Sequence, residues 1–182
     1  AHNQSNAVAA IDAVWHFTQD PTAIETGLGA FKGLPHRLAY VATVNNVEYY
    51  DDSIATTPSS AIAGLRAFEG RPVVVILGGS SKGSDFTELA TEIKARENNV
   101  KTILIGDEAT NIAAAFDAVL YANYEILQIP EGAAPAELFA RRASQLAEPG
   151  GVVLLSPSAA SFGLFKNYAD RGEQFIAAVN AL

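Results

Sequence analysis

Short uncharged runs alternate with helix-like segments through most of the chain. The runs VVVIL, TILI and VVLL fall in predicted strands at 72–77, 101–105 and 151–155, and such runs are typical of strands buried on both faces of a parallel sheet. A further strand is predicted at about 118–127. Strands that alternate with helices imply β-α-β crossovers. The pattern therefore predicts an α/β fold with a doubly wound, Rossmann-like, mostly parallel sheet, whose helices lie at 58–68, 85–97, 108–116, 134–147 and 162–180.

The first part of the chain has a different pattern. Residues 5–17 and a segment around 24–31 carry apolar residues at helical spacing and predict two helices. The segment GLPHR at 33–37 then ends the helical pattern, because the residue before a proline avoids the α region. After it, LAYVATV and VEYYD flank two asparagines and predict a β-hairpin. We therefore expect a helical segment over 1–33 and a separate domain over 34–182.

Composition narrows the classes of function. The net charge is −8 and the 12 basic residues form no run, which argues against a nucleic-acid partner, because such binding needs Lys and Arg to neutralise phosphates. No apolar stretch is long enough to cross a membrane. Without cysteine the chain has no disulfide, thiolate nucleophile or cysteine zinc site. We expect a cytoplasmic monomer and, since methionine is absent, a fragment of a longer protein.

Polar loops follow three of the predicted strands. They are YDDSIATTP after Tyr50, GGSSKGSDF after Leu77 and SPSAAS after Leu155. Because ligands of open α/β sheets bind beyond the carboxyl ends of the strands, we expect these loops to line one crevice. In the second loop, glycines expose backbone N–H groups and Lys82 offers a cation, which suits a carboxylate or a phosphate. The alternative is an ordinary strand-to-helix turn with a solvated lysine.

Several of the loop residues also have a purely structural interpretation. Ser161 can bind an anion at a helix N-terminus or simply cap that helix, and the sequence alone favours capping. Either Thr56 or Thr57 is expected to cap the helix that begins at 58. Asp52, at the end of a strand, is placed to accept hydrogen bonds from hydroxyls such as those of a ribose. For Asp51 we predict only a turn or capping role.

Common catalytic motifs are absent from the sequence. The second loop matches neither the Walker A pattern nor GxGxxG. The serines of the third loop lie in no GxSxG elbow and all three histidines lie far upstream, so a serine-hydrolase triad is not expected. The histidine spacing does not fit a metal site. His16, on an apolar helix, is interpreted as structural, whereas for His36 both interpretations stay open.

Five segments taken together resemble one known family. HNQSNAVAA, FKGLPHR, YDDSIATTP, LGGSSKGSDF and LLSPSAASFGLFKNYADRG occur in this order and resemble the C-terminal part of the Mur ligases, in particular the branch that adds D-glutamate in peptidoglycan synthesis. The resemblance covers nearly the whole chain. It implies that residues 1–33 end a central ATP-binding domain and that residues 34–182 form the amino-acid-binding domain of an ATP-dependent amide-bond ligase.

The resemblance also implies a reaction and a set of site residues. ATP, with Mg²⁺ held mostly outside this chain, phosphorylates the carboxylate of UDP-N-acetylmuramoyl-L-alanine, and the amino group of D-glutamate attacks the acyl phosphate. No metal ligand is implied in this chain. The implied ATP-binding residues are Asn3, Asn6, Arg37 and Asp52. The implied D-glutamate-binding residues are Thr56, Lys82, Ser161 and Tyr168. Arg37 and Lys82 are implied to be catalytic.

The sequence departs from the family pattern at three positions. Ile54 replaces a lysine of many members, Thr57 replaces an asparagine, and Tyr168 stands where phenylalanine is common. The chain also lacks a P-loop and a UDP-binding domain, so we expect this fragment to be inactive alone. Two alternatives stay open, namely a ligase of the same superfamily for another amino acid and a non-catalytic module that binds an acidic small molecule.

Overall fold

A computed structural model describes residues 2–182, with side chains from residue 6 onward. The chain divides into two compact units, and the division falls between Leu34 and Pro35. The first unit is a pair of helices, α1 (His2–Trp15) and α2 (Pro21–Ala30). Asp20 caps α2 by accepting a hydrogen bond from the backbone N–H of Thr22 at 2.9 Å. A proline in the first turn completes a typical helix start.

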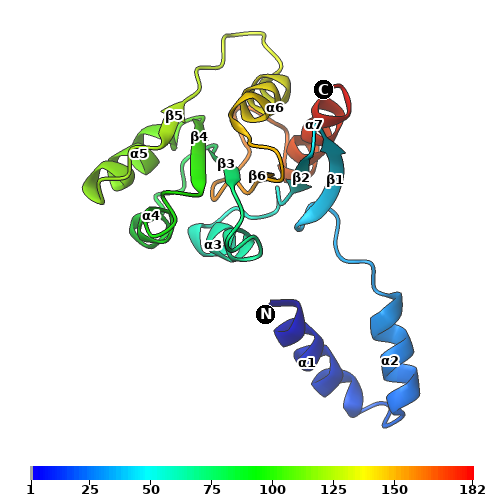
Figure 1. Ribbon diagram of the computed structural model, residues 1–182. Helices are drawn as coiled ribbons and strands as arrows, with labels where there is room; N and C mark the ends of the chain where they lie inside the picture. The colour runs from blue at the N-terminus through cyan, green and yellow to red at the C-terminus, as the bar shows by residue number, and fades with distance from the viewer. Residues whose placement is uncertain (1) are drawn as a thin grey trace. The chain divides into compact units, whose positions relative to one another are not determined.

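The second unit is a six-stranded sheet with helices on both faces (Figure 1). Its strands are β1 (Ala39–Val44), β2 (Val47–Asp51), β3 (Val73–Gly78), β4 (Val100–Ile105), β5 (Tyr124–Ile126) and β6 (Val152–Leu155). Its helices are α3 (Pro58–Arg66), α4 (Thr87–Lys94), α5 (Ala109–Ala118), α6 (Pro135–Leu146) and α7 (Tyr168–Asn180). The strand order is β1-β2-β6-β3-β4-β5, and only β1 runs antiparallel to its neighbour. The predicted doubly wound, mostly parallel α/β fold is confirmed.

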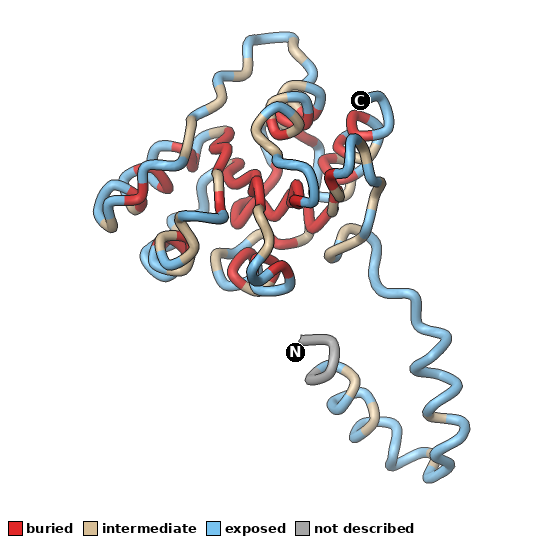
Figure 2. The backbone as a smooth tube through the Cα atoms, in the orientation of Figure 1, coloured by how far each residue is buried: buried red, intermediate tan, exposed pale blue. Residues whose placement is uncertain are grey.

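Two hydrophobic layers enclose the sheet. Helices α3, α4 and α5 cover one face, and α6 and α7 cover the other (Figure 1). On β3, Val73, Val75 and Leu77 pack into the first layer, while Val74 and Ile76 pack into the second. The buried residues therefore concentrate on the central strands (Figure 2). Because both faces are covered, these strands need apolar residues at successive positions.

Two local predictions are confirmed. Strands β1 and β2 form the expected hairpin, and its turn residues Asn45 and Asn46 have φ values of 51° and 62°, which asparagine tolerates better than most residues. Thr57 caps α3, because its hydroxyl accepts a hydrogen bond from the N–H of Ser60 at 3.3 Å. The cap is thus the second of the two threonines considered.

The predicted strand at about 118–127 is too long. Helix α5 continues to Ala118, and Leu120 turns the chain with a φ of 56°. Only Tyr124–Ile126 pairs with β4. Apolar residues that looked like the start of a strand instead belong to a helix end and a turn, since apolar content alone does not distinguish the two.

The helix predicted at 162–180 begins later than expected. Helix α7 starts at Tyr168, and the side chain of Asn167 caps it by accepting a hydrogen bond from the N–H of Asp170 at 2.9 Å. The preceding residues form a loop. The interpretation of Ser161 as the cap of this helix is therefore wrong, because an asparagine directly before the helix takes that role.

Phe116 offers a test of the first hydrophobic layer. Its side chain is fully buried on α5, with the ring centroid 4.8 Å from that of Tyr121 and 5.4 Å from that of Tyr124. Phe116→Ala should lower the free energy of unfolding in urea by about 3–5 kcal/mol, because a cavity replaces the ring. Leu120→Ala, at an 82% exposed position, should change it by no more than about 0.5 kcal/mol. Equal effects of the two substitutions would contradict this packing.

Candidate functional site

The three polar loops lie side by side at the carboxyl edge of the sheet. We name them loop A (51–57), loop B (78–86) and loop C (156–161). The N–H of Ser158 donates to the carbonyl of Ala55 at 2.8 Å, which joins loop C to loop A. The N–H of Ser80 donates to the carbonyl of Ala160 at 2.9 Å, which joins loop B to loop C. The three loops are therefore neighbours, whereas the crevice that we expect them to line stays a prediction.

Loop B needs glycine where it passes loop C. Gly79 has a φ of 144°, and a Cβ there would lie 2.0 Å from the carbonyl oxygen of Ala160. No side chain larger than hydrogen fits at that distance, and non-glycine residues rarely adopt such a φ. Gly83 also has a positive φ but faces open space. The first glycine therefore permits the contact between the loops, while the second only shapes the turn.

A buried arginine fastens loops A and C to helix α7. Arg171 is fully buried. Its Nε donates to Ser53 Oγ and its Nη2 to the Ser53 carbonyl, both at 2.9 Å, and Nη1 and Nη2 donate to the carbonyl of Ala159 at 3.3 Å. Burial lowers the pKa of Arg171 to about 10, while the charge of Asp51 opposes this shift. The side chain therefore stays charged at neutral pH.

Sequence reasoning missed Arg171 and Ser53, although both lie in segments quoted for the family resemblance. The only local signal was a charged residue followed by glycine inside an amphipathic helix. The glycine has a packing reason, since a Cβ on Gly172 would lie 2.3 Å from His36 Nδ1 and 2.7 Å from Asp51 Oδ2. The roles of these residues depend on contacts with three segments that are distant in the sequence. A local sequence pattern cannot reveal such contacts.

Asp51 does more than the turn role predicted for it. Its Oδ1 accepts a hydrogen bond from the N–H of Ser53 at 2.9 Å, which is the expected turn. Its Oδ2 lies 2.6 Å from Nδ1 of His36, and the carboxylate is fully buried. His36 is thus held by Asp51, and the ring of Tyr168 lies edge-on to it with centroids 6.2 Å apart.

Asp52 is also buried and makes its hydrogen bonds inside the protein. Its Oδ1 accepts from the N–H of Leu38 at 3.1 Å and its Oδ2 from the hydroxyl of Ser156 at 2.8 Å. Burial raises the pKa of Asp52 to about 6, and the hydrogen bonds from Ser156 and Leu38 and the charge of Arg37 act against that rise. A contact between Asp52 and a ribose stays a prediction, since both oxygens are engaged in this structure.

The residues predicted to bind the amino acid differ in accessibility. Lys82 is exposed, and among the described residues it forms no ion pair. Tyr168 is 41% exposed and Thr56 partly exposed, whereas Ser161 is buried in loop C. The three loops and the start of α7 thus bring these four residues to the same edge of the sheet. A role for each in binding remains a prediction.

The residues predicted to bind ATP are divided between the units. Asn6 is an exposed residue of α1, and Asn3 lies outside the residues with described side chains. Arg37 is exposed in the second unit, close enough to Asp52 for its charge to lower the pKa of that carboxyl group. The structure therefore groups Arg37 with Asp52 and leaves the asparagines as a separate prediction.

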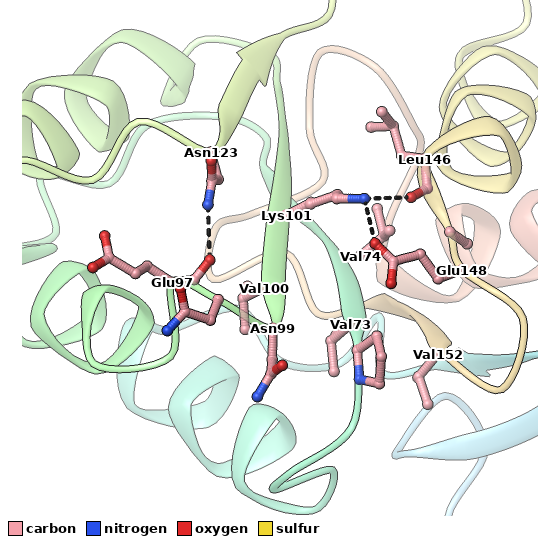
Figure 3. A pocket seen from close by; sticks show the side chains of 13 residues that line it. Val73, Val74, Glu97, Asn99, Val100, Lys101, Asn123, Leu146, Glu148 and Val152 are labelled. Atoms are coloured by element: carbon pink, nitrogen blue, oxygen red, sulfur yellow. Dashed lines mark hydrogen bonds and ion pairs between the residues drawn. The ribbon is translucent and has the colours of Figure 1, made fainter.

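A small depression lies at the opposite, amino edge of the sheet (Figure 3). The first residues of β3, β4 and β6 line it, together with the end of α6. Its lysine, Lys101, donates to Glu148 Oε1 at 2.8 Å and to the carbonyl of Leu146 at 3.2 Å. This cation is already neutralised, so the depression is poorly suited to an anionic ligand.

Two further kinds of feature are absent from the described part of the chain, in which side chains are placed from residue 6 onward. No group of three or more His, Asp or Glu side chains is arranged to hold a metal ion there. None of the helices described is both long and apolar enough to cross a membrane.

Comparison with protein families shows to which family the chain belongs. The family model described as "Mur ligase, glutamate ligase domain" matches residues 36–159. The protein belongs to the Mur ligase family. This Mur ligase chain is 40% identical over 181 residues to a protein of Thiobacillus denitrificans, and 39% identical over 180 residues to one of Pelotomaculum thermopropionicum. Both are named UDP-N-acetylmuramoylalanine--D-glutamate ligase. These matches cover 100% and 96% of the chain but only 36% of each relative.

Solved structures show the same fold. MurF of Acinetobacter baumannii superposes with a TM-score of 0.68 at 17% identity, and the match covers 98% of the chain and 38% of the MurF chain. MurF of Thermotoga maritima was determined in complex with ADP. It superposes with a TM-score of 0.62 at 16% identity, and the match covers 97% of the chain and 37% of the MurF chain. At such low identity these likenesses establish the fold of the Mur ligase chain, and they say nothing of its substrate.

The buried carboxyl of Asp52 should make stability depend on pH. Because its pKa of about 6 in the folded protein lies above the ordinary 3.8, Asp52 favours folding most at acidic pH, and this contribution is lost as the pH rises through 6. Between pH 4 and pH 7 the wild type should lose up to about 3 kcal/mol more unfolding free energy than Asp52→Asn, at about 1.4 kcal/mol per pKa unit. Urea titrations at both pH values check this. Parallel pH profiles of the two proteins would contradict it.

Proposed function

We propose that this Mur ligase chain is the amino-acid-binding part of an ATP-dependent ligase that adds D-glutamate to UDP-N-acetylmuramoyl-L-alanine in cytoplasmic peptidoglycan synthesis. Residues 34–182 would form the binding domain, and residues 1–33 would end the central ATP-binding domain. The protein would act as a monomer on small molecules. Support for the substrate comes from the names of relatives that are 35–40% identical over nearly the whole chain.

In the proposed reaction, the carboxylate of the UDP-linked substrate attacks the γ-phosphorus of ATP and releases ADP. The free amino group of D-glutamate then attacks the carbonyl carbon of the acyl phosphate. Inorganic phosphate leaves, and the nitrogen loses a proton as the amide forms. Such a reaction depends mainly on positioning and on neutralising charge. The part of this chain would be to hold D-glutamate by its two carboxylates while the amino group stays free.

The observation that carries the proposal is the cluster of loops A, B and C around an exposed cation. Lys82 is exposed and forms no ion pair with a described residue, and Thr56 offers a hydroxyl at the same edge of the sheet. A carboxylate prefers charge-assisted hydrogen bonds of this kind. Ser161 is buried, so within this proposal it would act on the ligand only through a small rearrangement of loop C.

The residues that we propose to bind ATP are Asn3, Asn6, Arg37 and Asp52. A Mur ligase of the same fold is known in complex with ADP, which supports ATP as the cofactor. For Mg²⁺ the described residues do not fit, because they contain no suitable group of metal ligands. We therefore assign no step to Mg²⁺ in this chain and expect its ligands elsewhere in the full-length enzyme.

Binding of D-glutamate to the 182-residue protein tests the site. Calorimetric titration should show that Lys82→Ala weakens binding about tenfold or more, because it removes a charge-assisted contact. Lys101→Ala is the matched control, since this lysine is paired with Glu148 at the opposite edge and its loss should leave binding unchanged. Competition by other amino acids would identify a ligase of different specificity. Equal binding by wild type and Lys82→Ala would contradict the site.

The 182-residue protein should show no ligase activity alone. It spans about 36% of the relatives' length and contains no P-loop, so the loop that would hold the ATP phosphates is absent from it. Phosphate release should stay at background with ATP, Mg²⁺, UDP-N-acetylmuramoyl-L-alanine and D-glutamate, and should appear with the full-length protein. ATP-dependent ligase activity of the 182-residue protein would contradict the proposal that catalysis needs the rest of the full-length enzyme. A parent sequence without a P-loop would instead favour a binding module.

A further inference from the structure

Loop B carries the exposed Lys82 but has little structure of its own. Between β3 and α4 it forms no helix or strand beyond the bridge at Ser80. Gly79 and Gly83 both adopt positive φ, and Gly83 faces open space. A loop with these features samples many conformations unless something outside it holds its tip. The position of a cation on such a loop depends on that attachment.

The attachment comes from Glu108, at the start of α5. Its Oε1 accepts a hydrogen bond from the backbone N–H of Lys82 at 3.1 Å. Its own backbone N–H donates to the carbonyl of Gly79 at 3.0 Å. One residue thus holds loop B at two points, three residues apart. Gly106 permits this approach, because a Cβ there would lie 2.8 Å from the carbonyl oxygen of Gly79.

Glu108 occupies the N-cap position of α5, yet its side chain makes no capping hydrogen bond. Short polar side chains such as Ser, Thr, Asp and Asn ordinarily cap a helix at this position, and the longer glutamate side chain is free to reach further. Here the carboxylate instead bonds to loop B, and its Oε2 is fixed by Nδ2 of Asn111 at 2.7 Å. The carboxylate therefore links the first turn of its own helix, through Asn111, to a loop from another part of the chain.

The carboxylate is also kept ionised despite being only 1% exposed. Burial alone would raise the pKa of Glu108, but hydrogen bonds, among them those from Asn111 Nδ2 and the N–H of Lys82, outweigh it and lower the pKa. Hydrogen bonds to a charged acceptor are about twice as strong as neutral ones. The N–H of Lys82 belongs to loop B, so the ionised carboxylate strengthens the hydrogen bond that holds this loop.

We propose that Glu108 is a positioning residue that sets the conformation of loop B and thereby places the Lys82 ammonium group for the carboxylate of the amino-acid substrate. It does not touch the substrate itself. The proposal rests on the proposed function for the identity of the ligand, whereas the effect on the loop can be measured without any ligand.

The test compares Glu108→Ala and Glu108→Gln with Asp107→Asn in the 182-residue protein. Asp107 is the exposed neighbour of Glu108, so its substitution removes the same charge without the contact to the loop. Amide hydrogen exchange, followed by NMR, should show the Lys82 amide exchanging about tenfold faster in Glu108→Ala. The amides of β3 should keep their protection, which shows that the fold is intact. Glu108→Gln should recover part of the protection, because an amide oxygen still accepts the bond.

Titration with D-glutamate supplies the second measurement. Binding should weaken about tenfold in Glu108→Ala, by less in Glu108→Gln, and not in Asp107→Asn. Unchanged exchange at Lys82 in a folded Glu108→Ala protein would overturn the proposal. If the wild type fails to bind D-glutamate, the proposed function falls, and the exchange data still decide whether Glu108 holds the loop. Faster exchange with unchanged binding would show that Glu108 holds the loop but does not affect ligand binding. That result would also overturn the positioning role.

Discussion

The hydrogen bonds of the Arg171 guanidinium join three segments that are far apart in the chain. They reach from α7 to both polar atoms of Ser53 in loop A and to the carbonyl of Ala159 in loop C. Burying a cation is costly unless it is hydrogen-bonded, and here three oxygen atoms and the nearby Asp51 offset that cost. Without the guanidinium two loop carbonyls would lose their buried donor. The conformation of loops A and C therefore depends on a helix that follows both of them in the sequence.

The features that could be predicted from the sequence are those determined by local rules. Strands covered on both faces must be apolar at successive positions, which is why VVVIL and VVLL were interpreted correctly. The asparagine pair marked the hairpin, and the threonine before Pro58 marked a helix start. Parallel strands end at the same edge, so three polar loops after three strands had to be neighbours.

The features that could not be predicted depend on partners distant in the sequence. Arg171, Asp51 and Glu108 are charged residues, which are rarely fully buried unless they are paired, and a sequence read locally places them on the surface. Their burial follows from tertiary contacts with loops A, B and C. The start of α7 was misplaced for a related reason. Residues 162–167 have helix-like apolar content, but Asn167 offers a better cap.

The adjacent acids Asp51 and Asp52 show how a repelling pair is accommodated. Each carboxylate has its own partners, with His36 beside Asp51 and the N–H of Leu38 bonded to Asp52. His36 and Leu38 both adopt positive φ, at 61° and 46°, a conformation that costs about 1–3 kcal/mol per non-glycine residue. The two carboxylates offset that cost, because each one binds one of the strained residues. Arg37 lies between these two anchored residues. The acid pair therefore fixes the backbone from which the exposed Arg37 side chain extends, although the two carboxylates still repel each other.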